Sequence, residues 1–258
     1  MRPNRYTRVQ LAAADKLHEN LSRQSQSIQS ARELFSLTLR KGIEKQRLKQ
    51  VVVFQRPDRL RSEFFLPGIL QTSALVVARD GTLESLDVTR KTYTSGVASV
   101  DNARRLLAVP FTLEELMLWT TGTVFIPNET RATDISYWLN PRNDHHYAVI
   151  PLEGEREVQV EFVLEEDRPR LLALDMLEGL ERERVFVSRF IYSEKDNDGS
   201  NTVDQTLPQK IEFWALDDSL SGELERESTS LYPPELPLSL FRVYPPRAYT
   251  RSSLDTAE

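Results

Sequence analysis

Hydrophobic and polar residues alternate through most of this chain, and that spacing predicts a protein built mainly from β-strands. Phe35, Leu37 and Leu39 alternate with polar residues, and so do the apolar residues from Val158 to Leu164. Successive side chains of a strand point to opposite faces, so this pattern is typical of strands with one buried face. Helices do not alternate with the strands, which favours an antiparallel meander over a parallel βαβ sheet.

The segment from Val51 to Gly96 predicts four or five of these strands in succession. Pro57-Asp58 ends the first strand, because proline lacks the N–H that a central ladder needs. Asp80-Gly81 is typical of a hairpin turn, and Ser73 to Ala78 is apolar on both faces. One turn is apolar where turns are normally polar, which indicates either contact with lipid or a turn folded back onto the protein. That turn consists of Leu66, Pro67, Gly68, Ile69 and Leu70.

Helical spacing is strong in two regions. Apolar residues recur every three, four or seven positions from Val9 to Ile28, which predicts an N-terminal helix. The pattern from Val100 to Gly122 predicts two short helices, and Thr112 with Glu115 forms a capping box at the start of the second. Because these short apolar helices are inserted between strands, we interpret residues 102–121 as a lid on the sheet.

The inward faces of the strands and the lid carry enough apolar side chains to line a cavity. Each ligand CH₂ group buried there would contribute ~0.8 kcal/mol, so acyl chains would need no polar partner. An ordinary filled core is the alternative, because apolar faces are usually core. Arg59 and Arg61 flank an inward-facing leucine and are candidates for the cavity mouth, or else for a solvated outer face. The candidate lipid-cavity residues are Phe35, Leu37, Phe54, Phe64, Leu75, Leu106, Leu116, Trp119, Val160, Phe162 and Phe213.

Composition narrows the classes of function. The 258 residues, 40% of them hydrophobic, fit a single domain over residues 1–250 followed by a disordered tail at 251–258. A net charge of −6 argues against nucleic-acid binding and against docking on anionic lipid by charge alone. The lack of cysteine excludes disulfides and thiolate sites. No apolar run approaches the ~20 residues of a membrane-spanning helix.

Asp144-His145-His146 is the strongest candidate for chemistry in the chain. Adjacent residues of a strand point to opposite faces, so the two histidines cannot readily share one metal ion. Neither a His-Glu-x-x-His nor a Gly-x-Ser-x-Gly motif occurs. The segment from Asp196 to Gly199 resembles part of a calcium-binding loop but lacks the distal glutamate. We therefore expect no catalytic residue, no metal site and no cofactor.

Several short motifs follow one another along most of the chain. They are Phe54-Gln55-Arg56-Pro57-Asp58-Arg59-Leu60-Arg61, Leu66-Pro67-Gly68, Asp80-Gly81, Lys91-Thr92-Tyr93 with Gly96, Leu106-Leu107, Pro110, Leu116 to Gly122, Leu207 to Ile211, and Pro237-Leu238 through Phe241 to Pro245. In their order and spacing they resemble the outer-membrane lipoprotein carriers LolA and LolB and their uncharacterised lipoprotein relatives. The run from Leu116 to Gly122 is similar to the LolB pattern Leu-x-x-Trp-x-x-Gly.

This resemblance implies a mainly β (α+β) fold, namely a bent, incompletely closed antiparallel barrel of about eleven strands with an N-terminal helix and a short helical lid. It implies a non-enzymatic carrier or acceptor of lipid or lipoprotein acyl chains. Residues 66–70 match the apolar loop by which LolB-like members reach the membrane, here the inner leaflet of the outer membrane. The implied location is the periplasmic face of that membrane, with a lipid anchor whose signal segment and cysteine lie outside this chain. We further expect a monomer that binds no nucleic acid.

Two other functions are open on the sequence alone. A scaffold lipoprotein of the same fold would have a filled barrel and would bind another envelope protein, with the acidic segment from Glu223 to Glu227 as a candidate surface. A hydrolase that uses Asp144 and His146 would need a nucleophile that the sequence does not identify.

Overall fold

The structure is a computed structural model that describes residues 6–68, 71–193, 206–215, 220–231 and 236–255. Two predicted features, the end of the apolar turn at Ile69 and Leu70 and the segment from Asp196 to Gly199, lie outside the described residues. The described chain is mainly β, with three α-helices and one 3-10 helix. None of these helices is long and apolar enough to cross a membrane.

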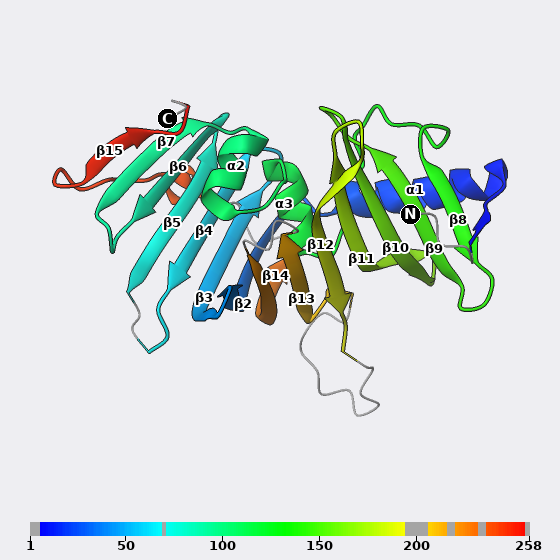
Figure 1. The fold of residues 1–258 in the computed structure, drawn as a ribbon, viewed down its shortest axis with the longest axis horizontal. Coiled ribbons are helices and arrows are strands. Elements are labelled where there is room, and N and C mark those ends of the chain that lie inside the picture. The colour runs from blue at the N-terminus through cyan, green and yellow to red at the C-terminus, as the bar shows by residue number, and fades with distance from the viewer. Residues whose placement is uncertain (1–5, 69–70, 194–205, 216–219, 232–235, 256–258) are drawn as a thin grey trace.

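The described strands form one sheet of fifteen, bent into an open half-barrel (Figure 1). Their order is β1-β8-β9-β10-β11-β12-β13-β14-β2-β3-β4-β5-β6-β7-β15, so β1 and β15 are free edges and the barrel does not close. Neighbouring strands are antiparallel, except that β15 runs parallel to β7. The strands are β1 Thr7–Arg8, β2 Ser30–Lys41, β3 Glu44–Gln55, β4 Arg59–Phe65, β5 Thr72–Arg79, β6 Thr82–Asp87, β7 Thr92–Val97, β8 Ser136–Asn140, β9 His145–Pro151, β10 Arg156–Glu165, β11 Arg168–Glu178, β12 Glu183–Ile191, β13 Lys210–Ala215, β14 Ser221–Leu231 and β15 Thr250–Ser253.

The bent and incompletely closed sheet was predicted, but the number of about eleven strands was too low. The edge strands β1 and β15 have two and four residues, which is too short to produce a recognisable alternation. Strand β14 was missed because its sequence is rich in glutamate. A strand that is paired on both sides can still carry charged residues on one face when its neighbours offer opposite charges.

The sheet has two halves: the first consists of β2 to β7 with β15, and the second of β8 to β12 with β1. Strands β13 and β14 join them, because β14 pairs with β2 and β13 pairs with β12. The segment from Glu223 to Glu227, considered as a candidate protein-binding surface, is therefore part of a strand paired on both sides, and its Glu225 and Glu227 side chains are exposed. Lys210 Nζ lies 2.9 Å from Glu223 Oε2, and Lys49 pairs with Glu227. Basic residues of the adjacent strands thus neutralise these carboxylates.

Helix α1 (Leu11–Ser27) confirms the predicted N-terminal helix and crosses the second half of the sheet (Figure 1). It packs mainly on β11, on the face that we call the inner face. Leu17 and Leu21 form its buried apolar stripe. Gln24 Nε2 donates to the carbonyl of Pro169 at 2.9 Å, which ties the end of the helix to β11.

Helices α2 (Val100–Leu107) and α3 (Leu113–Thr120) form the predicted pair of short helices, also on the inner face (Figure 1). The capping box of α3 is confirmed: Thr112 Oγ1 accepts from Glu115 N at 3.2 Å, and Glu115 Oε2 accepts from Thr112 N at 2.9 Å. Helix α2 is capped by Ser99, whose Oγ accepts from Asn102 N at 3.2 Å. Both helices are therefore fixed at their first turns by their own sequence.

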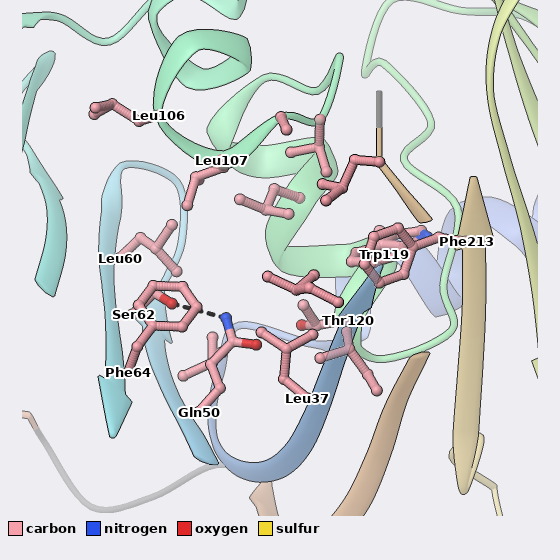
Figure 2. A pocket seen from close by; sticks show the side chains of 17 residues that line it. Leu37, Gln50, Leu60, Ser62, Phe64, Leu106, Leu107, Trp119, Thr120 and Phe213 are labelled. Carbon is pink, nitrogen blue, oxygen red and sulfur yellow. Dashed lines mark hydrogen bonds between the residues drawn. The ribbon is translucent and has the colours of Figure 1, made fainter. Parts of the chain in front are cut away.

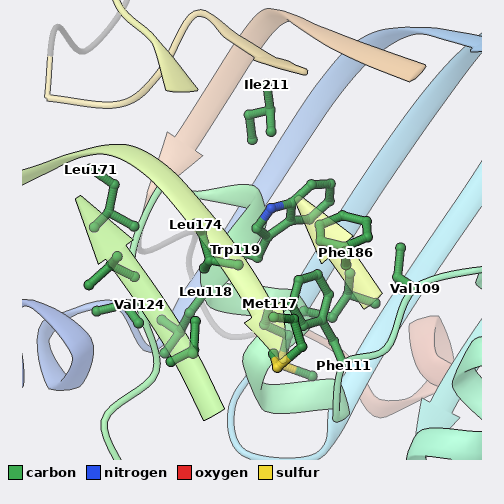
Figure 3. Close-up of a cluster of buried hydrophobic side chains, with 14 of the residues drawn as sticks. Val109, Phe111, Met117, Leu118, Trp119, Val124, Leu171, Leu174, Phe186 and Ile211 are labelled. Carbon is green, nitrogen blue, oxygen red and sulfur yellow. The ribbon is translucent and has the colours of Figure 1, made fainter. Parts of the chain in front are cut away.

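The larger of the two described core clusters covers the inner face of both halves of the sheet, and Figure 3 shows the part of it around α3. Phe111 and Phe186 meet edge to face with ring centroids 5.0 Å apart, and Trp119 packs edge to face on Phe186 at 5.8 Å. Met117 and Leu118 of α3 are fully buried beside them. Helix α3 is thus the centre of the core rather than a loose cover over it.

A smaller cluster lies on the opposite, outer face of the sheet. There Phe241, from the 3-10 helix η1 (Leu238–Phe241), is buried against Val53, Leu75 and Val77. The apolar residues between Leu238 and Val243 are spaced as in a short strand, but residues 238–241 form a 3-10 helix instead. The carbonyl of Pro237 accepts from Leu240 N at 2.9 Å, which closes a 3-10 turn directly after the proline.

The C-terminal segment is ordered, contrary to the prediction of a disordered tail at 251–258. Strand β15 pairs with β7, and Leu254 after it is buried. Asp255 Oδ1 accepts from Val97 N at 2.9 Å and from Asn102 Nδ2 at 2.8 Å. The segment has little apolar content, so its order comes from hydrogen bonds that hydrophobic spacing does not reveal. Residues 256–258 lie outside the described part.

Candidate apolar binding site

A pocket of about 240 Å³ lies between the inner face of β2, β3 and β4 and the two lid helices (Figure 2). Small-molecule sites usually measure roughly 300–1,000 Å³, whereas an engineered apolar cavity of ~150 Å³ already holds benzene. The pocket therefore has room for a short stretch of hydrocarbon. Its walls are formed by Leu37, Leu39, Gln50, Val52, Leu60, Ser62, Phe64, Leu106, Leu107, Ala108, Val109, Leu116, Trp119, Thr120, Phe213, Leu220 and Leu224.

The strand side of the pocket follows from alternation along the sheet. Leu60, Ser62 and Phe64 are every second residue of β4, so all three side chains point inward. Gln50 on β3 donates from Nε2 to Ser62 Oγ at 2.8 Å, the bond drawn in Figure 2. The two polar side chains of this wall thus bond to each other, which leaves a mainly apolar surface.

Helix α2 forms the opposite side with Leu106 and Leu107, both half-buried (Figure 2). Its last turn ends at Ala108, which adopts the left-handed conformation with φ 56°. Arg104 pairs with Glu178 of β11. Arg105 Nη1 donates to the carbonyl of Leu254 at 2.7 Å. The helix is therefore held by polar contacts at its ends and sides, rather than by a deeply buried apolar face.

Helix α3, the floor of the pocket, is held by ion pairs at its N-terminal end. Arg156 Nη1 lies 2.7 Å from Glu115 Oε2, and Arg156 Nη2 lies 2.9 Å from Glu115 Oε1. The two side chains are only 7% and 6% exposed. Arg56 donates from Nε to Glu114 Oε1 at 2.9 Å and also contacts the carbonyl of Ile28 at 3.3 Å. These bonds link α3 to β10 and to the end of α1.

At its C-terminal end, α3 is held by a fully buried arginine of β14. Arg226 donates from Nη2 to the carbonyl of Thr120 at 2.6 Å and from Nε to the carbonyl of Pro208 at 2.8 Å. It also pairs with Glu33 of β2, and its guanidinium lies 4.9 Å from the ring centroid of Phe35. A cation at the C-terminus of a helix interacts favourably with the helix dipole.

Trp119 separates the pocket from a second, smaller hollow in the other half of the molecule. It is the one residue that lines both spaces among the described residues. Its ring packs on Phe213 at 5.8 Å, which lines the pocket, and on Phe111 at 5.6 Å, which lines the hollow. Trp119 Nε1 donates to Ser188 Oγ at 3.1 Å, which fixes the orientation of the indole. Trp119 therefore lies between the pocket and a hollow of only about 10 Å³.

The structure brings six of the eleven predicted cavity residues together around the pocket and places the other five elsewhere. Those six are Leu37, Phe64, Leu106, Leu116, Trp119 and Phe213. Phe35, Phe54, Val160 and Phe162 are buried in the main core away from the pocket. Leu75 lies in the outer cluster, because in a strand that is apolar on both faces the alternation gives no indication of which residues point inward.

The predicted cavity mouth at Arg59 and Arg61 is not part of the pocket. Both residues alternate with the inward-facing Leu60, so their side chains lie on the outer face. Arg61 donates from Nη2 to Glu63 Oε2 at 2.7 Å and from Nη1 to the carbonyl of Leu240 at 3.1 Å. It therefore holds η1 against the sheet.

The apolar turn between β4 and β5 is exposed in its described part. Leu66 is 39% exposed, and Pro67 and Gly68 after it are exposed too. Gly68 has φ +78°, a conformation that glycine adopts readily. The turn is thus not folded back over Leu66 to Gly68, and its contact with lipid stays a prediction.

The residues considered for chemistry do not form a site. His145 Nδ1 lies 2.7 Å from Glu161 Oε1, whereas His146 stacks on Phe162 with ring centroids 5.3 Å apart. Burial lowers the pKa of His146. Among the described residues, no three His, Cys, Asp or Glu side chains gather in a way that could hold a metal ion.

Sequence reasoning missed several pocket residues that lie on the predicted strands and helices. Leu60 was predicted to face inward but was not among the candidate cavity residues, and Leu107 was identified only as part of a motif. Leu39 continues the alternation of Leu37, which was the available signal. Leu220 directly precedes the missed strand β14, and Leu224 lies within it, so no predicted element contained either residue.

No protein-family model and no curated protein matches this chain. Solved structures do match it. A LolA superfamily protein from Nitrosomonas europaea superposes with a TM-score of 0.56 at 10% identity, over 89% of this chain and 97% of that one. An outer membrane lipoprotein-sorting protein domain from Vibrio parahaemolyticus gives a TM-score of 0.53 at 8% identity, over 90% and 97%. This chain has the LolA fold.

A third structure, a DUF1329 family protein from Desulfovibrio piger, superposes with a TM-score of 0.58 at 10% identity, over 90% of this chain and 97% of that one. The LolA fold therefore spans nearly the whole chain, and the resemblance found in the sequence motifs is confirmed at the level of the fold. At sequence identities of 8–10%, these matches show that the architecture is shared and say nothing about which ligand is bound.

Proposed function

We propose that this protein is a non-enzymatic carrier or acceptor of lipid or lipoprotein acyl chains at the outer membrane. The apolar pocket of about 240 Å³ under the lid helices carries this proposal. The two polar side chains on its strand side, Gln50 and Ser62, form a hydrogen bond with each other. A bound hydrocarbon chain would therefore leave neither of them without a hydrogen-bond partner. The names of the LolA superfamily protein and of the lipoprotein-sorting domain with the same fold agree with a role in lipid or lipoprotein traffic.

In this proposal the protein acts as a monomer on the periplasmic face of the outer membrane, lipid-anchored in its full-length form, and binds no nucleic acid. Leu66, Pro67 and Gly68 meet the inner leaflet with the remainder of their turn, and the acyl chain enters beside Leu106 and Leu107. Both leucines are half-buried, as are Leu39, Phe64 and Leu220 on the strand side, and in this proposal they form the lid side of the entrance.

Filling the pocket tests this proposal. Leu107→Trp adds an indole at the entrance and should weaken binding of a fluorescent fatty-acid probe by about ten-fold or more, the equivalent of several buried CH₂ groups. Leu180→Trp is the matched control, because Leu180 is 87% exposed on the β11–β12 turn and does not line the pocket. The proposal fails if the unmodified protein binds no acyl probe, or if Leu107→Trp binds it as tightly as the control.

The two alternatives have less support. The acidic segment considered as a scaffold surface, Glu223 to Glu227, belongs to strand β14, and two of its carboxylates, Glu223 and Glu227, pair with lysines of adjacent strands. A hydrolase would need a nucleophile near Asp144 and His146, and His146 lies against Phe162 instead. Neither a protein-binding scaffold nor a hydrolase is therefore proposed.

A further inference from the structure

The tip of the β2–β3 hairpin carries the most exposed large apolar side chain in the described residues. Ile43 is fully exposed, at 104%, and follows Gly42, whose φ of +58° allows the two-residue turn. No described residue covers it. An isoleucine presented in this way at the end of a long hairpin serves no purpose in the core of the protein, which favours a contact outside it.

Basic side chains surround this tip. Arg40, Lys41, Lys45 and Arg47 are exposed, with Glu44 as the one acid among them. Among the described residues, only Arg40 of these four has an ion pair, a 3.6 Å contact with Glu223. The rest of the chain is acidic enough to bring the net charge to −6. The hairpin is thus a local concentration of positive charge on an acidic protein, and Lys41, Lys45 and Arg47 have no ion pair among the described residues.

Two further connections lie at the same edge of the sheet, because alternate turns of an antiparallel meander share an edge (Figure 1). Lys49 is opposite Phe65 in the β3–β4 register, so the apolar turn that begins at Leu66 lies beside the hairpin. The β6–β7 connection brings exposed Arg90 and Lys91 to this edge. Apolar tips and basic residues therefore occur together along one edge.

We propose that this edge docks on a membrane surface rich in anionic phospholipid. Ile43 enters the boundary between headgroups and acyl chains, and Lys41, Lys45 and Arg47 meet the phosphates. The combination of apolar and basic groups is what such a surface binds. This inference goes beyond the proposed function, because the hairpin does not line the pocket, it adds a basic and apolar contact beside the apolar turn, and docking does not require a bound acyl chain.

Vesicle binding of the full chain tests the proposal directly. Co-sedimentation is measured with vesicles of phosphatidylcholine alone and with vesicles that contain phosphatidylglycerol. The unmodified protein should prefer the anionic vesicles and should release them as salt is raised. Lys45→Gln with Arg47→Gln should weaken binding roughly thirty-fold, since each basic residue near such a surface contributes about five-fold. Ile43→Ser should weaken it by roughly ten-fold.

Matched controls separate the edge from general effects of charge and hydrophobicity. Leu180→Ser removes an exposed leucine from the β11–β12 turn, and Arg131→Gln with Arg168→Gln removes two exposed basic residues from the other half of the sheet. These controls should bind as the unmodified protein does. Equal binding to neutral and anionic vesicles, or hairpin variants that behave like the controls, would overturn the proposal. Leu107→Trp should keep vesicle binding, so failure of the pocket proposal is distinguishable from failure of this one.

Discussion

Glu115 and Arg156 form a two-point ion pair in the interior, with both N–O distances between 2.7 and 2.9 Å. Glu115 has a second task, because its Oε2 also caps the first turn of α3 through Thr112 N. One carboxylate thus starts the helix that floors the pocket and fixes that helix to β10. Its loss would affect both helix formation and helix position.

Removal of one partner of this pair should be costly. Arg156→Met leaves Glu115 charged and buried, which should lower the free energy of unfolding by about 3–5 kcal/mol. Addition of Glu115→Gln should recover part of that loss, because the stranded charge is gone. Arg23→Met is the control, since the Arg23–Glu19 pair is exposed and should contribute at most about 1 kcal/mol. Urea unfolding measures all three, and an equal loss for Arg156→Met and Arg23→Met would contradict the prediction.

Trp119 should set the length of acyl chain that the pocket accepts. Trp119→Leu would join the pocket to the hollow behind it, so affinity should continue to rise by about four-fold per CH₂ over chain lengths at which the unmodified protein has levelled off. A series of fatty acids competing with a fluorescent probe measures this. Trp214→Leu is the control, because Trp214 is adjacent to Phe213 on β13 and faces the other way. Identical length profiles for both variants would show that Trp119 is only part of the core.

Asp255 should stabilise α2 from outside the helix. Asp255→Ala removes the acceptor of Val97 N and Asn102 Nδ2, so hydrogen exchange over α2 should accelerate and stability should fall by roughly 1–3 kcal/mol. Asp101→Ala is the comparison, as this exposed acid in the first turn of α2 interacts only with the helix dipole, worth about 0.3–1 kcal/mol. An Asp255 variant with unchanged exchange over α2 would show that the lid does not depend on the C-terminal segment.

His146 should make the protein less stable in mild acid. Burial lowers its folded-state pKa below that of the unfolded chain. The unfolded state therefore takes up a proton first as the pH falls, so stability is complete above the unfolded pKa of about 6.5 and declines from there to the lower folded pKa. His146→Phe should keep the stacking on Phe162 and remove this decline. Thermal unfolding between pH 8 and 5 measures it, and an unchanged pH profile in the variant would argue against His146 as the cause.

The elements could largely be predicted from the sequence, because the physical signals were local. The alternation from Val158 to Leu164 lies within β10, and the capping box at Thr112 marks the start of α3. The direction in which a side chain points was harder to predict. Leu75 and its neighbour Val76 are both apolar. Leu75 points to the outer face, where η1 covers it, and Val76 points to the inner face.

The pocket itself could be predicted only in part. The pocket residues Leu37 and Phe64 and the core residues Phe35 and Phe54 all occupy inward positions of alternating strands. The hydrophobic pattern alone therefore cannot separate a cavity wall from a filled core. Their separation depends on where α2 ends, at Ala108, and on polar contacts such as the one from Arg105 to the carbonyl of Leu254. These contacts join residues about 150 positions apart, and no local pattern encodes them.

The pairing of β14 with β2 also determines when this protein can finish folding. Ser221 to Leu231 must find Arg40 to Ala31, partners that lie about 180 to 200 residues away in a chain of 258. Until β13 and β14 have left the ribosome, β2 and β12 both present open edges to other chains. Sheets completed by such distant pairing fold slowly. Until that pairing forms, the open edges of β2 and β12 make incomplete chains prone to pair with one another.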